Sequence, residues 1–149
     1  MSNDHESYVE MPLHVKVAAA VGFSLITART ERPMTLGGCK VTVGTYIDLG
    51  PCNAWGHSVR HVPHYDISWS DTGPLIERLK ISLEPWANGW TAAAPYEFQS
   101  PKDHQERGIL RWTGSCREHT ALIAVCNLIV NMDLYRREKG GRLTDWMGR

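Results

Sequence analysis

A chain of 149 residues with 42% hydrophobic and 21% charged residues has the composition of one globular domain with a sizeable core. Sixteen Lys and Arg residues balance sixteen Asp and Glu residues, which excludes a surface that is basic overall and disfavours nucleic acid as a partner. The sequence holds no run of about eighteen apolar residues, so we expect neither a membrane-spanning helix nor a membrane partner.

The two ends of the chain are expected to flank the folded domain. Residues 1–11 are polar and predict a flexible segment, and they lack the pattern of a signal peptide. Residues 136–149 hold more basic than acidic side chains and predict a solvated basic tail. A single domain over residues 12–135 is therefore predicted. The four cysteines show no CxxC spacing, so we expect the reduced thiols of a cytoplasmic protein.

The first fifty residues predict one helix and two strands. Pro12 opens a helix that runs to about residue 21, and residues 23–28 follow as a short strand. Residues 29–38 contain Pro and paired Gly and predict a loop. Residues 39–49 alternate in polarity and predict a longer strand. The side chains expected to share one face of that strand are Val41, Val43, Thr45 and Ile47.

Residues 50–68 fit no regular element and predict a long ordered loop, a kind of segment that is often functional. Asp71 or Thr72 can cap the helix that follows, with Pro74 in its first turn, where no hydrogen bond is lost. The apolar face of this helix is expected to hold Leu75, Ile76 and Leu79.

An Asn88-Gly89 turn joins strands predicted over residues 81–85 and 90–94, because both central residues of that turn type need positive φ. Residues 95–105 then predict a loop, and residues 109–112 a short strand.

Ser115 and Glu118 match a capping box and predict the start of a final helix, which ends before the Gly140-Gly141 pair. Cys126 falls within its apolar face and is expected in the core. The apolar stripe of this helix consists of Ala121, Leu122, Val125, Leu128, Ile129 and Met132. The elements together predict an α/β (α+β) fold, a single α/β/α-type sandwich with about three helices and a small, mainly antiparallel sheet.

Three segments resemble a family of bacteriophage proteins of unknown function, the NinX-like proteins and the related ABA-sandwich domains. They are HYDISWSDTGPLIERLKISLEPWANGWTAAA, REHTALIAVCNLIVNM and the opening helix MPLHVKVAAAVGF. The resemblance implies an α/β sandwich encoded by a phage and located in the cytoplasm of the host bacterium. It brings no established catalytic residues.

The predicted loop and its flanks combine aromatic faces with basic groups, which suits a nucleotide-like ligand. The candidate ligand-binding residues there are Trp55, His57, Arg60, His61, His64, Tyr65 and Asp66. The alternative for Tyr65 and Trp69 is that they anchor the loop in the core, and we favour this for Trp69. A weaker alternative is a zinc site formed by Cys52, His57, His61 and His64.

Cys116 is expected as the first residue of the last helix, where free N–H groups favour a thiolate or a bound anion. Arg111 and Arg117 lie near it in sequence and join the candidate ligand-binding residues. A catalytic role for Cys116 is the weaker hypothesis. Further tryptophans exceed the needs of one small core, and an exposed group of them would mark a partner site. These are Trp86, Trp90, Trp112 and Trp146.

No phosphate-binding glycine loop, GxSxG or HExxH motif is present in the sequence. We therefore expect a non-catalytic phage accessory protein without a cofactor. It would capture a host protein or a nucleotide-like signalling ligand and inhibit bacterial defence. The alternatives are a small hydrolase or transferase that uses Cys116 or the histidines of the loop, and a nucleic-acid-binding protein. The surplus of tryptophans is compatible with a homodimer.

Overall fold

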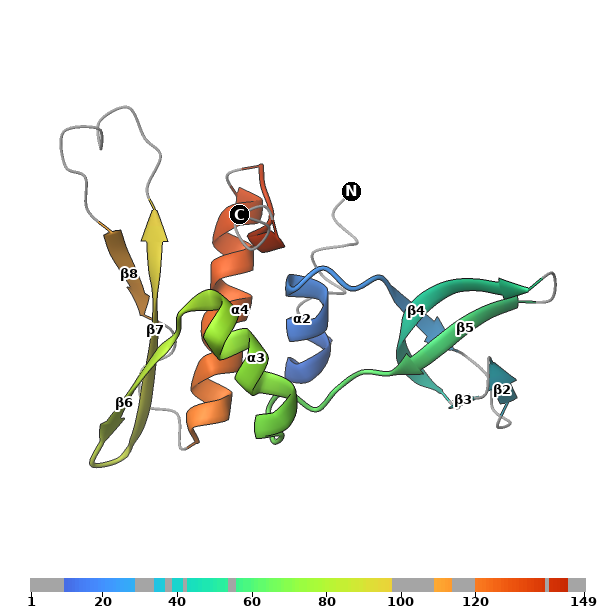
Figure 1. The fold of residues 1–149 in the computed structure, drawn as a ribbon, viewed down its shortest axis with the longest axis horizontal. Coiled ribbons are helices and arrows are strands. Elements are labelled where there is room, and N and C mark those ends of the chain that lie inside the picture. Colours follow the sequence, from blue (N-terminus) through green and yellow to red (C-terminus); the bar gives the residue numbers. More distant parts are fainter. Residues whose placement is uncertain are drawn as a thin grey trace. The chain divides into compact units, whose positions relative to one another are not determined.

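The structure, a computed structural model, describes residues 10–28, 34–36, 39–41, 43–53, 56–97, 109–113, 120–138 and 140–144. Side chains are described except within residues 34–40, 51–57, 95–97 and 109–113. The chain divides into two compact units, Met1–Pro63 and His64–Arg149, whose elements are labelled in Figure 1. Every strand pair of the described residues is antiparallel, and helices accompany the sheets, which confirms the predicted α+β class. Within these residues, each helix is too short or too polar to cross a membrane.

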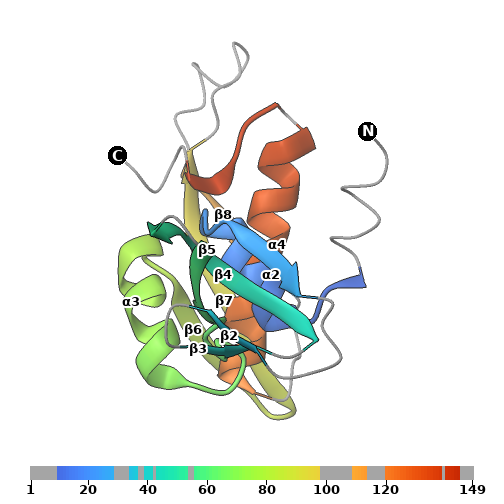
Figure 2. The same cartoon turned by 90° about the vertical axis from the view of Figure 1, so that its right-hand side faces the viewer.

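The first unit contains a three-stranded sheet in the order β1-β4-β5 and a two-stranded sheet formed by β2 and β3. The small hairpin lies against β5, as Figure 2 shows. Its elements are α2 (Leu13–Ala20), β1 (Leu25–Ala28), β2 (Met34–Leu36), β3 (Cys39–Val41), β4 (Gly44–Asn53) and β5 (Gly56–His61).

Helix α2 and strand β1 confirm the predictions for residues 12–28. Pro12 is the N-cap of α2, and its carbonyl accepts a hydrogen bond from the Lys16 N–H at 3.0 Å. The Phe23 N–H closes the other end of the helix on the Ala18 carbonyl at 3.1 Å. The polypeptide then enters β1, which pairs with β4.

Residues 34–49 differ from the prediction in two ways. β2 falls within the expected loop, and the expected strand over residues 39–49 is divided into β3 and β4, which belong to different sheets. Because the chain changes sheets, the alternation of residues 39–49 does not describe one face. Val41 and Ile47 are buried, whereas Val43 between the two strands is 66% exposed.

A small core holds the sheets of the first unit together. Val41 of β3 packs with Tyr46 of β4 and Val59 of β5, and all three side chains are buried. Ile26 and Ala28 of β1 lie against this cluster. The apolar contact between β3 and the larger sheet thus accounts for the close approach of the β2–β3 hairpin.

The predicted loop over residues 50–68 is wrong for its first half, because β4 continues to Asn53 and β5 occupies Gly56–His61. Asp48 pairs with Val59, Pro51 with His57 and Asn53 with Gly56, so β4 holds one extra residue in each of two intervals. These are β-bulges, which absorb glycine and proline that would interrupt a regular strand.

Gly50 occupies the first bulge with a φ of 90°, a conformation that glycine adopts without a steric penalty. Its N–H donates a hydrogen bond to Oδ1 of Asp48 at 2.8 Å. The strand is therefore kinked at a position where the neighbouring side chain satisfies the backbone.

The second unit contains a three-stranded sheet in the order β6-β7-β8. α4 packs against β7 and β8, and α3 contacts α4 (Figure 1). Its elements are α3 (Trp69–Leu79), β6 (Ser82–Trp86), β7 (Gly89–Glu97), β8 (Ile109–Thr113) and α4 (Ala121–Glu138).

Helix α3 starts earlier than predicted, because Ser68 is its N-cap and accepts a hydrogen bond from the Asp71 N–H at 3.4 Å. Pro74 is consequently the sixth residue of the helix and lies outside the first turn. The prediction that it sacrifices no hydrogen bond is therefore wrong, since a residue at this position normally donates to the carbonyl of Ser70. Lys80 ends the helix with a φ of 55°.

The β6–β7 hairpin is confirmed, but its turn is shifted by one residue. Trp86 pairs with Gly89, so Ala87 and Asn88 occupy the turn rather than Asn88 and Gly89. β7 also continues through Pro95, where a loop was predicted. β6 pairs with β7 only as far as Ala93, so Pro95 has a partner on one side, and its missing N–H interrupts no central ladder. β8 confirms the strand predicted over residues 109–112.

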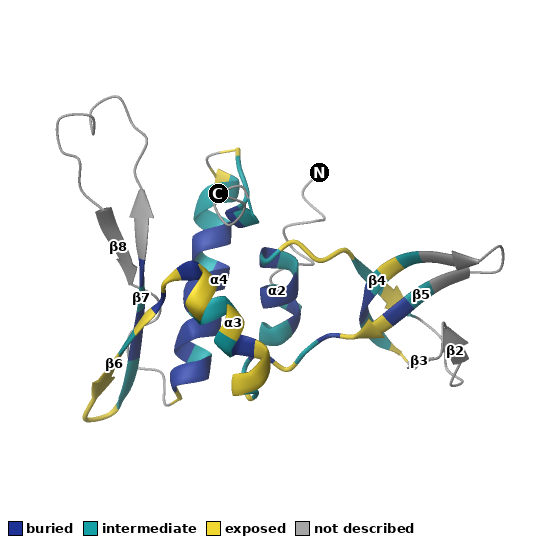
Figure 3. Ribbon diagram, in the orientation of Figure 1, coloured by how far each residue is buried: buried dark blue, intermediate teal, exposed yellow. Residues whose placement is uncertain are grey.

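Helix α4 confirms the last predicted helix, and its entire predicted apolar stripe is buried, together with Cys126 (Figure 3). The helix begins at Ala121, where Oγ1 of Thr120 accepts a hydrogen bond from the Ile123 N–H at 3.2 Å. Ser115 and Glu118, the predicted capping box, lie outside the described residues. Gly140 follows the helix with a φ of 81° and donates to the Arg137 carbonyl at 3.0 Å, so the predicted glycine end is confirmed.

Candidate functional site

Arg60, a predicted ligand-binding residue, lies exposed on β5. Its partner across the ladder is the buried Ile47 of β4. The Arg60 guanidinium carbon lies 5.1 Å from the centre of the Phe23 ring, a cation–π contact worth about 0.5–1 kcal/mol at an exposed site. Arg60 thus already covers an aromatic side chain of its own unit.

His61 follows Arg60 directly and points to the other face of the sheet, because successive side chains of a strand alternate. It lies opposite Tyr46, with the ring centres 5.3 Å apart and the planes at 51°. Since Arg60 and His61 lie on opposite faces of β5, they do not form one continuous ligand surface.

His64, Tyr65 and Asp66 belong to the second unit, in the turn that precedes α3. Tyr65 is buried, and its carbonyl accepts a hydrogen bond from Oγ1 of Thr72 at 2.6 Å. Tyr65 thus anchors the segment in the core, as the alternative to a ligand-binding role predicted. Oδ1 of Asp66 is buried and has no hydrogen-bond partner among the described atoms.

Three of the four weak zinc candidates lie on strands, and His64 lies in the turn that precedes α3. His57 and His61 both belong to β5, where four residues span about 13 Å along the strand. Cys52 lies on β4, and the side chains of Cys52 and His57 are outside the described part of the chain. His64 lies in the second unit.

Trp55, Cys116 and Arg117 lie outside the described residues, as does the side chain of Arg111 on β8. α4 begins at Ala121. The expectation of a thiolate or a bound anion at Cys116 falls on residues outside the described part of the chain.

Cys126 lies fully buried in α4. Burial, with a smaller contribution from the charge of Asp66, raises the pKa of its thiol from 9.0 to about 12. The reactive form of cysteine is the thiolate, so Cys126 is an inert core residue at neutral pH.

The tip of the β6–β7 hairpin carries two tryptophans, which lie on opposite faces of the hairpin because Trp86 pairs with Gly89 and Trp90 pairs with Pro85. Trp86 is 59% exposed, and the tip is visible as an exposed region in Figure 3. A shallow, open hollow is lined by Pro85, Trp86, Ala87, Asn88, Gly89 and Trp90. The expectation that surplus tryptophans face outward is confirmed for Trp86. The side chain of Trp112 and the whole of Trp146 are outside the described residues.

Trp69 is 55% exposed at the start of α3, so the prediction that it anchors the core is wrong. It is the first residue of the helix, directly after the Ser68 cap. Ile67 beside it is 73% exposed.

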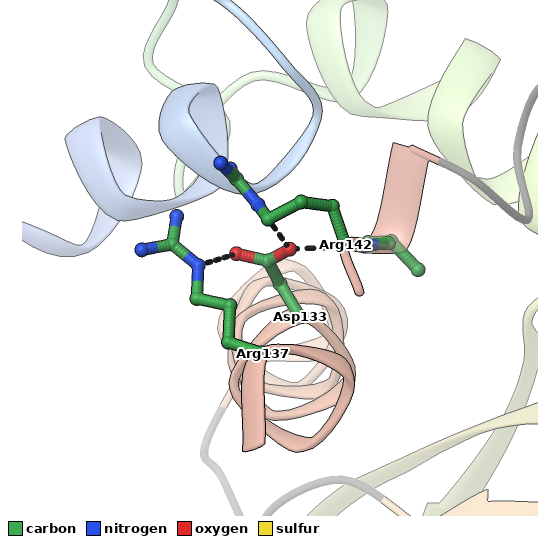
Figure 4. A network of polar contacts seen from close by, with 4 residues as sticks. Asp133, Arg137 and Arg142 are labelled. Carbon is green, nitrogen blue, oxygen red and sulfur yellow. Dashed lines mark hydrogen bonds and ion pairs between the residues drawn. The ribbon is translucent and has the colours of Figure 1, made fainter. Parts of the chain in front are cut away.

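A buried carboxylate, which the sequence did not single out, organises the end of α4 (Figure 4). Oδ2 of the fully buried Asp133 accepts a hydrogen bond from Nε of Arg137 at 2.8 Å. Oδ1 accepts one from Nε of Arg142 at 3.2 Å and one from the Leu143 N–H at 3.0 Å. Part of the predicted basic tail is therefore bound to α4. The spacing of Asp133 and Arg137, four residues apart on a helix, is the signal that indicates this pair.

The chain matches no family model, no curated protein and no solved structure at the level of significance required of such comparisons.

Proposed function

We propose that this protein is a non-catalytic binding module that captures another protein through the tip of its β6–β7 hairpin. The observation that carries the proposal is the 59% exposure of Trp86 at the tip of the hairpin, next to the turn formed by Ala87 and Asn88. Tryptophan buries a large area when it is covered, and it is enriched among the residues that dominate binding energy at protein interfaces.

The hollow favours a protein over a nucleotide-like ligand. Its six lining residues carry no charged side chain, whereas a ligand with phosphate groups needs cations or several aligned N–H donors. The basic candidate residues Arg60 and His61 lie in the other unit and contact aromatic rings there. In the setting that the phage resemblance implies, the partner would be a host protein, such as a component of a bacterial defence.

Site-specific photo-crosslinking tests this function. Benzoylphenylalanine at position 86 is expected to form a crosslink to one host protein in the bacterial cytoplasm, because the hairpin tip is the binding surface. Position 69 is the matched control, since Trp69 has nearly the same exposure and lies in the same unit but outside the hollow.

The purified partner should then bind the wild-type protein and lose at least tenfold in affinity for the Trp86→Ala variant. Circular dichroism would confirm that the variant remains folded. Equal crosslinking from both positions, or an unchanged affinity of the variant, would contradict the proposal. A crosslink between two copies of the chain would replace it with a homodimer.

A further inference from the structure

β6 forms an outer edge of the sheet in the second unit. Among the strands that the structure describes, it pairs with β7 alone. The outer side of such a strand carries N–H and C=O groups without a partner strand, to which a second chain can add a strand of its own. Four of the five residues of β6 are exposed, so another chain can reach this edge. Whether a strand can be added depends on the backbone groups that face outward.

The turn of the hairpin identifies the outward-facing groups. Trp86 and Gly89 flank a two-residue turn, so they form the hydrogen-bonded pair that closes it. Hydrogen-bonded and non-hydrogen-bonded pairs alternate along an antiparallel ladder, and the register of β6 and β7 has no interruption. The residues of β6 whose backbone groups face outward are therefore the alternate two, Leu83 and Pro85.

Pro85 removes the donor from one of these two outward positions. Proline has no N–H, so an added strand would find a single donor, the N–H of Leu83, along the whole of β6. The pyrrolidine ring also occupies the space in which the carbonyl of an added strand would have to lie. A proline on the outer side of an edge strand is tolerated by its own sheet and opposes the pairing of another strand.

Pro95 repeats this arrangement where β7 continues beyond β6. The ladder of β6 reaches β7 only as far as Ala93, so residues 94–97 of β7 form the edge on that side. Pro95 and Gly89 are separated by an even number of positions, and the backbone of Gly89 faces β6. The backbone of Pro95 therefore faces the same side, at which β6 has already ended. Each of the two strands that form this edge thus has a proline at an outward position.

We propose that Pro85 and Pro95 close this edge of the sheet to strand addition by a second copy of the chain. Trp86, which is 59% exposed, lies directly beside the edge. An exposed apolar side chain next to an open edge favours the association of copies, and the missing donors prevent such contacts from growing into a continuous sheet. This protection is independent of the proposed function, because it acts through the backbone and not through the indole of Trp86.

Light scattering coupled to size-exclusion chromatography, over a range of protein concentrations, tests the proposal. Pro85→Val restores an N–H in a residue that favours strands, so its mass at high concentration should reach about twice that of the wild-type protein through pairing of two β6 strands. Pro85→Lys is the matched control. It restores the same N–H but adds a charge, which opposes the pairing of two identical edges, so it should keep the mass of the wild-type protein.

Hydrogen exchange identifies the surface that associates. The amide hydrogens at positions 83 and 85 of Pro85→Val should exchange more slowly as its concentration rises. Association with fast exchange at both positions would overturn the proposal, as would equal association of the Val and Lys variants. An unchanged mass of a folded Pro85→Val protein would overturn it as well. If circular dichroism shows that Pro85→Val does not fold, Pro95→Val decides in its place, with the same expected rise in mass and the same contrary result.

Discussion

At the scale of single residues, the behaviour of several side chains depends on how deeply they are buried. The sequence gives the type of each residue but not its burial. Cys126 lies in the middle of a helix, where burial makes it a protonated core thiol. Asp133 lies toward the charged C-terminal end of the same helix and is fully buried, where two arginines and a backbone N–H bind it. Trp69 is apolar and exposed. Periodicity alone does not separate these cases.

The raised pKa of Cys126 predicts how stability changes at high pH. The unfolded chain releases the thiol proton near pH 9.0, whereas the folded protein holds it to about pH 12. Between these values the unfolded state binds fewer protons, so the free energy of unfolding falls as the pH rises, by up to about 1.4 kcal/mol per pH unit from this group. Below pH 9.0 the contribution is fully present.

Denaturant unfolding of the wild-type protein and of Cys126→Ala between pH 8 and pH 11 would measure this effect. Lysine and tyrosine titrate in both proteins, so the difference in slope isolates Cys126. Two parallel pH profiles would show that Cys126 titrates in the folded protein as it does in the unfolded chain.

At the scale of elements, the sequence predicts helices better than strands. The apolar stripe of α4 and its glycine end are confirmed because both are local properties of one helix. The first unit departs from prediction because its strands depend on partners far along the chain. Glycine and proline of β4 lie in bulges, which are defined by the pairing of β4 with β5. Residues 39–49 contribute to two different sheets.

The candidate site was also predictable only as far as local sequence reaches. The sequence predicts a tryptophan near the end of a hairpin, because the turn signal lies beside Trp86. The sequence could not indicate which tryptophans are covered, since α4 selects the buried face of the sheet through long-range packing. The Asp133 cluster was missed for a related reason, because Leu143 returns to it only after the chain has turned at Gly140.

Lys80 allows a test of how the end of α3 contributes to stability. It closes α3 in the left-handed conformation, with its N–H on the Glu77 carbonyl at 3.3 Å and the Ile81 N–H on the Ile76 carbonyl at 3.0 Å. A side chain with a Cβ atom is disfavoured there, and glycine is the usual residue. Lys80→Gly should therefore stabilise the protein by about 1 kcal/mol.

Thermal unfolding would detect this gain as a higher midpoint. Lys80→Ala is the control, since it removes the charge and retains the Cβ atom, and it should leave the midpoint nearly unchanged. A gain of the same size in both variants would assign the effect to the lysine charge rather than to the backbone.

At the scale of the whole molecule, the charge balance limits the range of partners. The net charge is zero, and two of the C-terminal arginines are already bound to Asp133. A protein with no net positive charge has no surface that is basic overall, and nucleic acids are bound chiefly through cations that displace their counterions.

Filter binding of double-stranded DNA and of RNA is expected to show at most weak retention at low salt, with little change as salt is added. A strong affinity that falls steeply with salt concentration would contradict this prediction. It would also revive the nucleic-acid alternative drawn from the basic residues of the C-terminal range. Arg137→Gln and Arg142→Gln would then show whether those residues supply the contacts.

The first bulge of β4 affects how β4 and β5 can be aligned with each other. Gly50 holds a φ of 90° at the first bulge, with Leu49 before it and Pro51 after it. If β4 slipped by one residue against β5, the bulge would require a positive φ from leucine or from proline. Leucine adopts that conformation at a steric cost, and the ring of proline forbids it. The glycine therefore fixes the alignment of the two strands and makes slipped pairings, which expose apolar faces and promote aggregation, energetically unfavourable.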